Sequence, residues 1–474
     1  MHTGLSGRDL ETARRILPRY VGAGPRYTSY PTVPVWQDAF SEADHRLALS
    51  RTGQQREISV YTHVPFCRSL CHFCACNRII TRDPALPARY LDAVERELAT
   101  TREAMGTAPR CVQLHWGGGT PTHLEPHQIE RLFRATIDRF PLADGAEVSI
   151  EVDPRVTRPD HVAALVDCGF DRISMGVQDT EPATQAAIHR IQPFEQTRAL
   201  TELVRDRGIE RVSFDLVYGL PHQTDVTMGR TLDAVLSLAP DRIALYAYAH
   251  VTWVAKQQRG FERGDLPSPE LRMAILSTAI ERLTAAGYRA VGMDHFARPD
   301  DELCRALDDG TLRRNFMGYT TQDGIDVVAF GPTAISELSG TYVQAEKDLA
   351  TWQDAVLAGR LATARGHRLT REDEKRRAII RDVMCQGALR AAAIDARFGG
   401  DFARDFQPAF ERLLRFEDDG LVRIGQGGDL DVTPLGRLFL RNIAMVFDAY
   451  LDDFGDGAAD GKPNTMAGTF SQTV

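Results

Sequence analysis

Residues 67–76 have the sequence CRSLCHFCAC and contain four of the eight cysteines in the chain. They follow residues 58–64, ISVYTHV, an apolar and β-branched run that predicts a strand. The thiols are therefore expected on a loop at the carboxyl end of that strand, where α/β folds place their chemistry. Thiolates clustered this tightly have three interpretations: a disulfide framework, a zinc site or an iron–sulfur cluster.

The spacing of the thiols favours an iron–sulfur cluster. Cys67, Cys71 and Cys74 are spaced C-x3-C-x2-C, so one short loop can wrap three thiolates around one face of a cubane and leave the fourth iron open. Cys76 follows Cys74 by only two residues and is poorly placed as a fourth ligand. Disulfides are disfavoured because the first residues carry no secretory signal and the other cysteines are scattered singly. A zinc site usually draws two separated ligand pairs, and no second pair follows, but zinc and a group of reduced thiols remain as alternatives.

The composition limits the class of protein. The 474 residues, 43% hydrophobic and 26% charged, suit one large domain plus a smaller one. No run of about eighteen apolar residues occurs, so we expect no membrane span. The net charge of −9 argues against non-specific nucleic-acid binding, although a local group of arginines can still bind an acidic small molecule. Free thiols and the lack of a signal peptide predict a cytoplasmic location.

Strand and helix patterns alternate from residue 58 to residue 249. After the first strand, further strands are predicted at residues 111–116, 147–152, 172–178, 212–218 and 242–249, with helices at 90–98, 129–140, 197–207 and 228–238. About six such βα units predict a parallel sheet with right-handed crossovers. Six units fall short of a closed eight-unit barrel, so we expect an open, partial (β/α)6 barrel of the TIM type, in the α/β class. An open side suits a large, flat substrate.

Polar and glycine residues gather at the predicted carboxyl ends of these strands. Residues 117–122, GGGTPT, follow the second strand, and glycines there let backbone N–H groups approach a ligand closely. The polar side chains at later strand ends are Glu151, Gln178, Asp215 and His250. Each alone is as compatible with a structural hydrogen bond as with ligand contact, but their recurrence at one end favours a site. Arg190 adds a fixed positive charge suited to a carboxylate.

The remaining segments do not share the alternating pattern. Residues 22–32, GAGPRYTSYPT, cannot form a regular helix and suggest a strap, whereas helices and a short hairpin without alternation follow residue 365. The acidic residues 416–419 argue against a winged-helix DNA binder. The predicted divisions are an N-terminal strap or lid at 1–50, the barrel with a substrate-side extension at 51–365, a small, mainly helical capping domain at 366–455, and a disordered tail at 456–474.

The cysteine loop resembles the signature of the radical S-adenosylmethionine (SAM) superfamily, C-x3-C-x2-C. With Cys76, the flanking residues 61–66, YTHVPF, and residues 26–32, RYTSYPT, the chain is similar to the family of oxygen-independent coproporphyrinogen III dehydrogenases. The resemblance spans nearly the whole chain. It implies a radical SAM partial barrel, a [4Fe–4S] cluster on Cys67, Cys71 and Cys74, and SAM bound at the open iron, with the glycine run at its amino group.

The resemblance also implies roles for the residues around the cluster. Contacts to the SAM at the open iron are implied for Tyr61, Gly118, Glu151 and Ile335. Contacts to a second SAM are implied for Phe73, Gly119, Thr120, Gln178, Arg190, Asp215 and Ala249. Tyr61 and Cys76 are the candidate catalytic residues, and we hypothesise that Cys76 does not ligate the cluster.

The activity implied by the resemblance is an oxidoreductase reaction on coproporphyrinogen III. A 5′-deoxyadenosyl radical abstracts a β-hydrogen from a propionate, and loss of CO2 and one electron leaves a vinyl group. Two such steps give protoporphyrinogen IX. The implied partners are the substrate and an electron donor such as flavodoxin or ferredoxin, with no nucleic acid or membrane, and we expect a monomer. The candidates for binding the substrate carboxylates are Arg26, Arg298, Arg313 and Arg314.

Two other functions stay open. One is a haem-trafficking protein of the same superfamily that does not decarboxylate. Members of that branch generally have Phe in place of Cys76 and lack the RYTSYPT segment, so both features favour the dehydrogenase. The other is a radical SAM enzyme that acts on a different tetrapyrrole or carboxylate.

Overall fold

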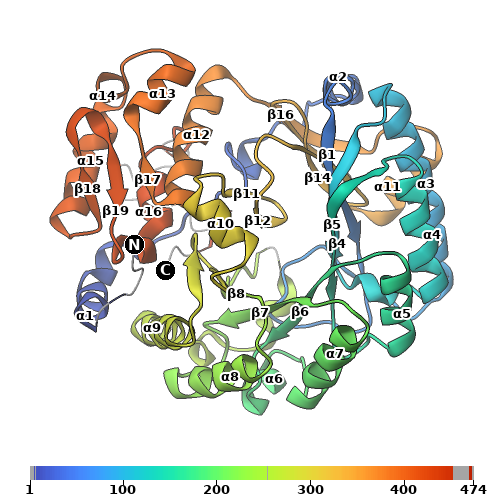
Figure 1. Ribbon diagram of the computed structural model, residues 1–474, viewed down its shortest axis with the longest axis horizontal. Helices are drawn as coiled ribbons and strands as arrows, with labels where there is room; N and C mark the ends of the chain where they lie inside the picture. The colour runs from blue at the N-terminus through green and yellow to red at the C-terminus, as the bar shows by residue number, and fades with distance from the viewer. Residues whose placement is uncertain (1–4, 6, 254, 452–468, 472–474) are drawn as a thin grey trace.

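The centre of the molecule is one sheet of twelve strands, in the order β16-β15-β14-β13-β1-β4-β5-β6-β7-β8-β10-β9 (Figure 1). The computed structural model describes residues 5, 7–253, 255–451 and 469–471. The strands that run parallel are β13 (Asp326–Phe330), β1 (Glu57–Val64), β4 (Arg110–Gly118), β5 (Leu142–Val152), β6 (Arg172–Gln178), β7 (Arg211–Tyr218) and β8 (Arg242–Ala247). The six predicted strands correspond to β1, β4, β5, β6, β7 and β8, and the predicted partial barrel is confirmed.

Antiparallel strands extend both sides of the parallel region. On one side β8 pairs with β10 (His295–Ala297) and then β9 (Arg289–Val291). On the other, β13 is followed by β14 (Ile335–Glu337), β15 (Thr341–Ala345) and β16 (Thr363–Arg368). The outermost strands β16 and β9 do not pair with each other in the described part of the chain, so the sheet stays open. The short strands are β2 (Phe66–Cys67), β3 (Ile79–Ile80), β11 (Arg313–Asn315), β12 (Gly318–Thr320), β17 (Ala388–Leu389), β18 (Val422–Ile424) and β19 (Leu430–Val432).

Helices cover the outer face of the parallel strands (Figure 1). They are α3 (Ala85–Met105), α4 (Pro126–Ile137), α5 (Pro159–Asp167), α6 (Pro182–Ala187), α7 (Phe194–Asp206), α8 (Asp225–Ser237) and α9 (Pro269–Ala285). Several of these helices begin about three residues before the first residue of their apolar pattern. Their first turn is polar, and capping hydrogen bonds stabilise it. In α8 the Thr224 hydroxyl accepts a hydrogen bond from the Thr227 backbone N–H at 3.1 Å.

Two hydrophobic cores organise the chain. The larger lies between the sheet and its helices, where Trp116, Phe214 and Phe330 are completely buried. The smaller core joins the two ends of the chain, because Tyr20 packs against Phe416 and Phe439 with ring centroids 5.0 and 5.1 Å apart. Its helices are α1 (Gly7–Ile16), α12 (Arg371–Gln386), α13 (Ala391–Phe398), α14 (Phe402–Asp405), α15 (Gln407–Asp418) and α16 (Leu440–Met445). Other helices are α2 (Glu42–Thr52), α10 (Glu302–Asp308) and α11 (Leu349–Leu357).

The N-terminal strap runs between the sheet and the C-terminal helices. Arg26 donates a hydrogen bond to the Ala247 carbonyl at 2.8 Å, and the Tyr27 hydroxyl donates to Asp448 at 2.9 Å. Of the predicted tail, only residues 469–471 are described, and Ser471 accepts a hydrogen bond from the Gly24 N–H at 3.0 Å. The rest of the tail lies outside the described residues. Within the described residues, no helix is both long and apolar enough to cross a bilayer.

A buried carboxyl group ties α3 to two other elements of the larger core. Glu97 is 6% exposed and accepts hydrogen bonds from the Gly331 N–H at 2.8 Å and from Trp352 Nε1 at 3.0 Å. Burial raises the pKa of Glu97 to about 7, and the two hydrogen bonds oppose the rise only in part.

We expect the free energy of unfolding to fall as the pH rises through this range. The folded protein holds the Glu97 proton more tightly than the unfolded chain does, so this contribution is complete below the ordinary value of 4.5 and is lost as the pH passes about 7. The shift corresponds to at most about 3 kcal/mol. Glu97→Gln cannot ionise and should lose less stability over this interval in urea unfolding of the cluster-loaded protein. Identical pH slopes for the two proteins would contradict this account.

Candidate active site

A cavity of about 510 Å3 lies at the carboxyl ends of the parallel strands. It collects residues from the cysteine loop, from the glycine loop after β4 and from the ends of β5 to β8. The predicted site residues that line it are Cys67, Cys71, Phe73, Cys74, Cys76, Gly118, Gly119, Thr120, Glu151, Gln178, Arg190, Asp215 and Ala249. The chain thus brings together residues that are up to 182 positions apart, from Cys67 to Ala249.

Tyr61 and Ile335 do not line this cavity. Tyr61 lies on β1, where its ring stacks on His115 at 6.0 Å between centroids. His115 Nε2 in turn lies 3.6 Å from Glu151 Oε1, so Tyr61 is one residue removed from the cavity wall. Ile335 begins β14, in register with Gln344 of β15.

The cysteine loop is held by hydrogen bonds to its backbone. The His72 N–H donates to the Ile188 carbonyl at 2.8 Å, and His189 Nδ1 bonds the Leu70 carbonyl at 2.9 Å. On the other side, Gln258 Nε2 donates to the Phe73 carbonyl at 2.8 Å. Because these bonds use backbone atoms, the thiol groups remain free to face the cavity.

The glycine loop packs directly against the strand that leads into the cysteine loop. The Gly119 N–H donates to the Val64 carbonyl at 2.8 Å, and the Thr120 N–H donates to the Phe66 carbonyl at 2.8 Å. A Cβ on Gly119 would lie 2.7 Å from the Pro65 carbonyl group, so no side chain fits there. Gly118 has a φ of +115°, which L side chains rarely adopt. The backbone of this loop is therefore open to a ligand on its cavity side.

Two arginines lie beside the Cys71 thiol. Arg155 Nη2 lies 3.5 Å and Arg190 Nη1 lies 3.7 Å from Cys71 Sγ. Both arginines also pair with Asp153, at 2.6 and 3.0 Å. Burial acts to raise the pKa of Asp153, but the charges of Arg190 and Arg155 outweigh it and lower the pKa to about 2. The Nε of Arg190 is buried without a hydrogen-bond partner among the described residues, which leaves one donor for a ligand.

The sequence analysis did not single out Asp153 or Arg155. Both follow β5 directly, next to the predicted Glu151, and they share the strand-end position that identified the other candidates. Their place at a strand end was therefore a sufficient signal to predict them as site residues. The pairing of Asp153 with Arg190 was not predictable in this way, because Arg190 lies 37 residues further along the chain.

The donor set fits an iron–sulfur cluster. A hydrogen bond from Cys76 lowers the pKa of Cys74 to about 6, despite burial, and two guanidinium groups lie beside the Cys71 sulfur. Within the part of the chain that the structure describes, no three His, Cys, Asp or Glu side chains are grouped to hold a single metal ion. In a cubane each thiolate binds a different iron, so the three sulfurs need not meet at one point. Cys67, Cys71 and Cys74 could therefore hold a [4Fe–4S] cluster.

The pKa values of two carboxyl groups that line the cavity are shifted in opposite directions. Partial burial acts to raise the pKa of Glu151. Its contacts with His115 and the Gly118 N–H, which donates at 3.2 Å, outweigh that effect and lower the pKa. Burial and the nearby Glu151 charge raise the pKa of Asp215 to about 7. Glu151 therefore stays anionic and can accept hydrogen bonds from a cationic amine, whereas Asp215 can donate or accept near neutral pH.

The four candidate arginines for substrate carboxylates lie in different places. Arg26 lines the cavity. Arg298 does not, because its N–H bonds the Asp241 carbonyl just before β8, at the opposite end of that strand. Arg313 and Arg314 line a separate cavity.

Comparison with known proteins identifies the family. Residues 61–235 match the family model of the radical SAM superfamily, and residues 369–439 match that of the HemN C-terminal domain. The chain is 41% identical over 437 residues to an oxygen-independent coproporphyrinogen III oxidase from Helicobacter pylori strain J99, covering 91% of this chain and 95% of the relative. It is 40% identical over 440 residues to the enzyme of that name from Pseudomonas aeruginosa, covering 92% and 95%.

A solved structure agrees with these relatives. The structure titled as coproporphyrinogen III oxidase (HemN) from Escherichia coli, a radical SAM enzyme, has a TM-score of 0.86 and 41% identity. The similarity covers 90% of this chain and 97% of the other. Identity at this level over almost the whole of both chains, together with the three thiols of the C-x3-C-x2-C loop in one cavity, shows that the chain belongs to the oxygen-independent coproporphyrinogen III oxidase family of radical SAM enzymes.

Proposed function

We propose that this protein converts two propionate side chains of coproporphyrinogen III to vinyl groups and so forms protoporphyrinogen IX. The relatives are named for oxidation of coproporphyrinogen III. The observation that carries the proposal is that Arg26 of the strap lines the same cavity as the three cysteines and the glycine loop. A guanidinium group there provides a partner for a substrate carboxylate beside the cofactor residues.

The residues of the cavity divide the work of binding. Cys67, Cys71 and Cys74 would hold the cluster, and the backbone of Gly118 with the Glu151 carboxylate would hold the SAM amino group. When bound, the reduced cluster and SAM together supply a 5′-deoxyadenosyl radical. The fixed loops would orient SAM toward one C–H bond of the substrate.

We propose a second SAM in the same cavity. Its binding residues would be Phe73, Gly119, Thr120, Gln178, Arg190, Asp215 and Ala249. The support is the unused Nε donor of Arg190 and the raised pKa of Asp215, which suit a carboxylate and a polar group of a ligand. Tyr61, stacked on His115, and Ile335 are proposed to complete the first SAM site on substrate or cofactor binding.

We also propose the wider setting of the reaction. An electron donor such as flavodoxin or ferredoxin supplies the electron for each SAM, and the chain acts as a monomer without nucleic acid. A cytoplasmic location is proposed because the described cysteines are free thiols, as expected in a reducing compartment. The strap at 1–50 is proposed as a lid, and the helices after residue 365 as a separate capping domain.

The proposal is tested by an anaerobic assay of cluster-loaded protein with dithionite, SAM and coproporphyrinogen III. We expect vinyl tetrapyrroles and 5′-deoxyadenosine to form together, and Cys74→Ser to give neither. SAM cleavage without a vinyl product would contradict the proposed substrate. Stable haem binding without SAM cleavage would instead support the haem-trafficking alternative.

Cys76 is proposed to act in the cavity without ligating the cluster. Cys76 lines the cavity, is exposed to solvent and lies beside Cys74. We expect Cys76→Ser to assemble a cluster with the same iron content and absorbance as the parent protein, but to form vinyl product at least about tenfold more slowly, as for the loss of a positioned proton donor. Loss of the cluster in Cys76→Ser, as in Cys74→Ser, would overturn the assignment.

A further inference from the structure

A second cavity lies far from the cysteine loop, between the sheet and the C-terminal helices. It has a volume of about 620 Å3, and its lining comes from the β11–β12 hairpin, from β14 and from α12 and α13. Its lining residue Asp326 is in register with Ile58, near the start of β1, whereas the cysteine loop follows the end of β1. The length of β1 from Ile58 to Val64 separates the two levels by about 20 Å.

The charged residues of this cavity are mostly arginines. They are Arg313, Arg314, Arg371, Arg377, Arg381 and Arg397, against the carboxylates Asp323, Asp326, Glu337 and Glu374. One of the carboxylates is already occupied, since Asp326 Oδ2 accepts hydrogen bonds from Thr52 at 2.6 Å and from the Ser339 N–H at 2.8 Å. These donors are neutral and leave the Asp326 charge in place, so six arginines against four carboxylates give the lining an excess of positive charge.

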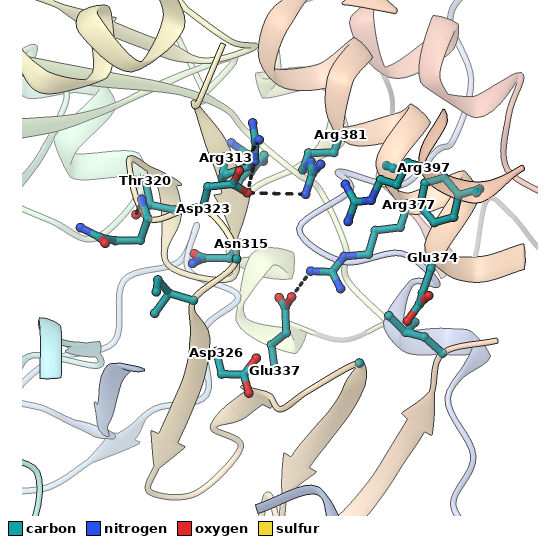
Figure 2. A pocket seen from close by; sticks show the side chains of 18 of the residues that line it. Arg313, Asn315, Thr320, Asp323, Asp326, Glu337, Glu374, Arg377, Arg381 and Arg397 are labelled. Atoms are coloured by element: carbon teal, nitrogen blue, oxygen red, sulfur yellow. Dashed lines mark hydrogen bonds and ion pairs between the residues drawn. The ribbon is translucent and has the colours of Figure 1, made fainter. Parts of the chain in front are cut away.

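The arginines project from two sides of the cavity and lie close to one another. Figure 2 shows the side chains of Arg377, Arg381 and Arg397 from the helices, and of Arg313 from the hairpin, around one common space. Arg377 and Arg381 are four residues apart on α12, so these like charges share one helix face, which is unfavourable. Burial and then the neighbouring arginine charges lower the pKa values of both, that of Arg377 to about 10.

The nearby carboxylates compensate this charge only in part. Asp323 pairs closely with Arg313, at 2.5 Å, but lies 3.9 Å from Arg381. Arg377 pairs with Glu337. The Nε of Arg381 makes no hydrogen bond among the described residues, and the nearest carboxylate to it, that of Asp382, lies 3.8 Å away. Arg397 is exposed and makes no ion pair with any described carboxylate. Two guanidinium groups thus have donors available toward the cavity.

We propose that this cavity binds a small, multiply charged oxyanion, with at least two carboxylate or phosphate groups. Guanidinium groups bind both kinds of oxyanion with two parallel hydrogen bonds. The cavity is too large for one such group, and its arginines lie on separate elements, so a ligand with several charges fits it best. A bound anion would link the hairpin to α12 and α13. This site is additional to the proposed reaction at the cysteine loop.

The test is calorimetric titration of the cluster-loaded protein with two probes, pyrophosphate and tricarballylate, repeated at several fixed concentrations of NaCl. We expect at least one probe to bind, with affinity that falls as NaCl is added. The Arg381→Gln/Arg397→Gln variant should bind roughly tenfold more weakly or not at all. Arg404→Gln removes an exposed arginine of the same region, outside the cavity, and should bind like the parent protein. The tighter probe identifies phosphate or carboxylate as the ligand chemistry.

Two results would overturn the proposal. One is that neither probe binds at millimolar concentration. The other is that the double variant binds as tightly as the parent protein, which would place the anion elsewhere. Arg397 is exposed and supports no described ion pair, so Arg397→Gln alone should fold. If the double variant does not fold, this single variant must still weaken binding several-fold. The assay for vinyl product uses none of these probes. A negative result in the binding test therefore does not affect the test of the proposed reaction.

Discussion

The site depends on the close contact between two stretches of backbone, the end of β1 with the cysteine loop and the glycine loop after β4. Two backbone hydrogen bonds, Gly119 N–H to Val64 and Thr120 N–H to Phe66, join them. The contact exists only because Gly119 has no Cβ, which would lie 2.7 Å from the Pro65 carbonyl. Since the cysteine loop begins where this contact ends, the position of all its thiols relative to the glycine-loop backbone follows from it.

A compact set of charges extends this contact into the cavity. Asp153 sits between Arg155 and Arg190, and both guanidinium groups also approach the Cys71 sulfur. Burying these charges is costly for each alone, and the arrangement is stable because each charge has an opposite partner and further hydrogen bonds. The same arginines lie where an anionic cluster and a ligand carboxylate would add negative charge. The local electrostatics and the thiol chemistry therefore support the same type of ligand.

Local sequence patterns were sufficient for six of the described parallel strands, but not for β13. They also indicated the strand-end residues Glu151, Gln178 and Asp215, which line the cavity. The predicted strand at residues 172–178 coincides with β6, and the others differ from the observed strands by a few residues at an end. Strand ends and the cysteine spacing are local signals, so the cavity lining was largely predictable. The strands β14, β15 and β16 were not predicted, because they are short and depend on successive pairing outward from β13 rather than on their own periodicity.

Contacts between distant segments were beyond local patterns. The N-terminal Tyr20 shares a core with Phe416 and Phe439, which lie about 400 residues further along the chain. The arginine-lined cavity combines a hairpin with two helices of the C-terminal region, so no single stretch of sequence indicates it. The hairpin itself depends on the antiparallel pairing of the two short strands β11 and β12.

The central claim is that three thiols hold a [4Fe–4S] cluster whose fourth iron binds SAM. The most direct measurement is electron–nuclear double resonance of the reduced cluster with SAM that carries 15N in its amino group. The account predicts a hyperfine coupling from the labelled nitrogen, because that nitrogen ligates the open iron. A cluster that shows no coupling to the label, with SAM present at saturation, would contradict the account.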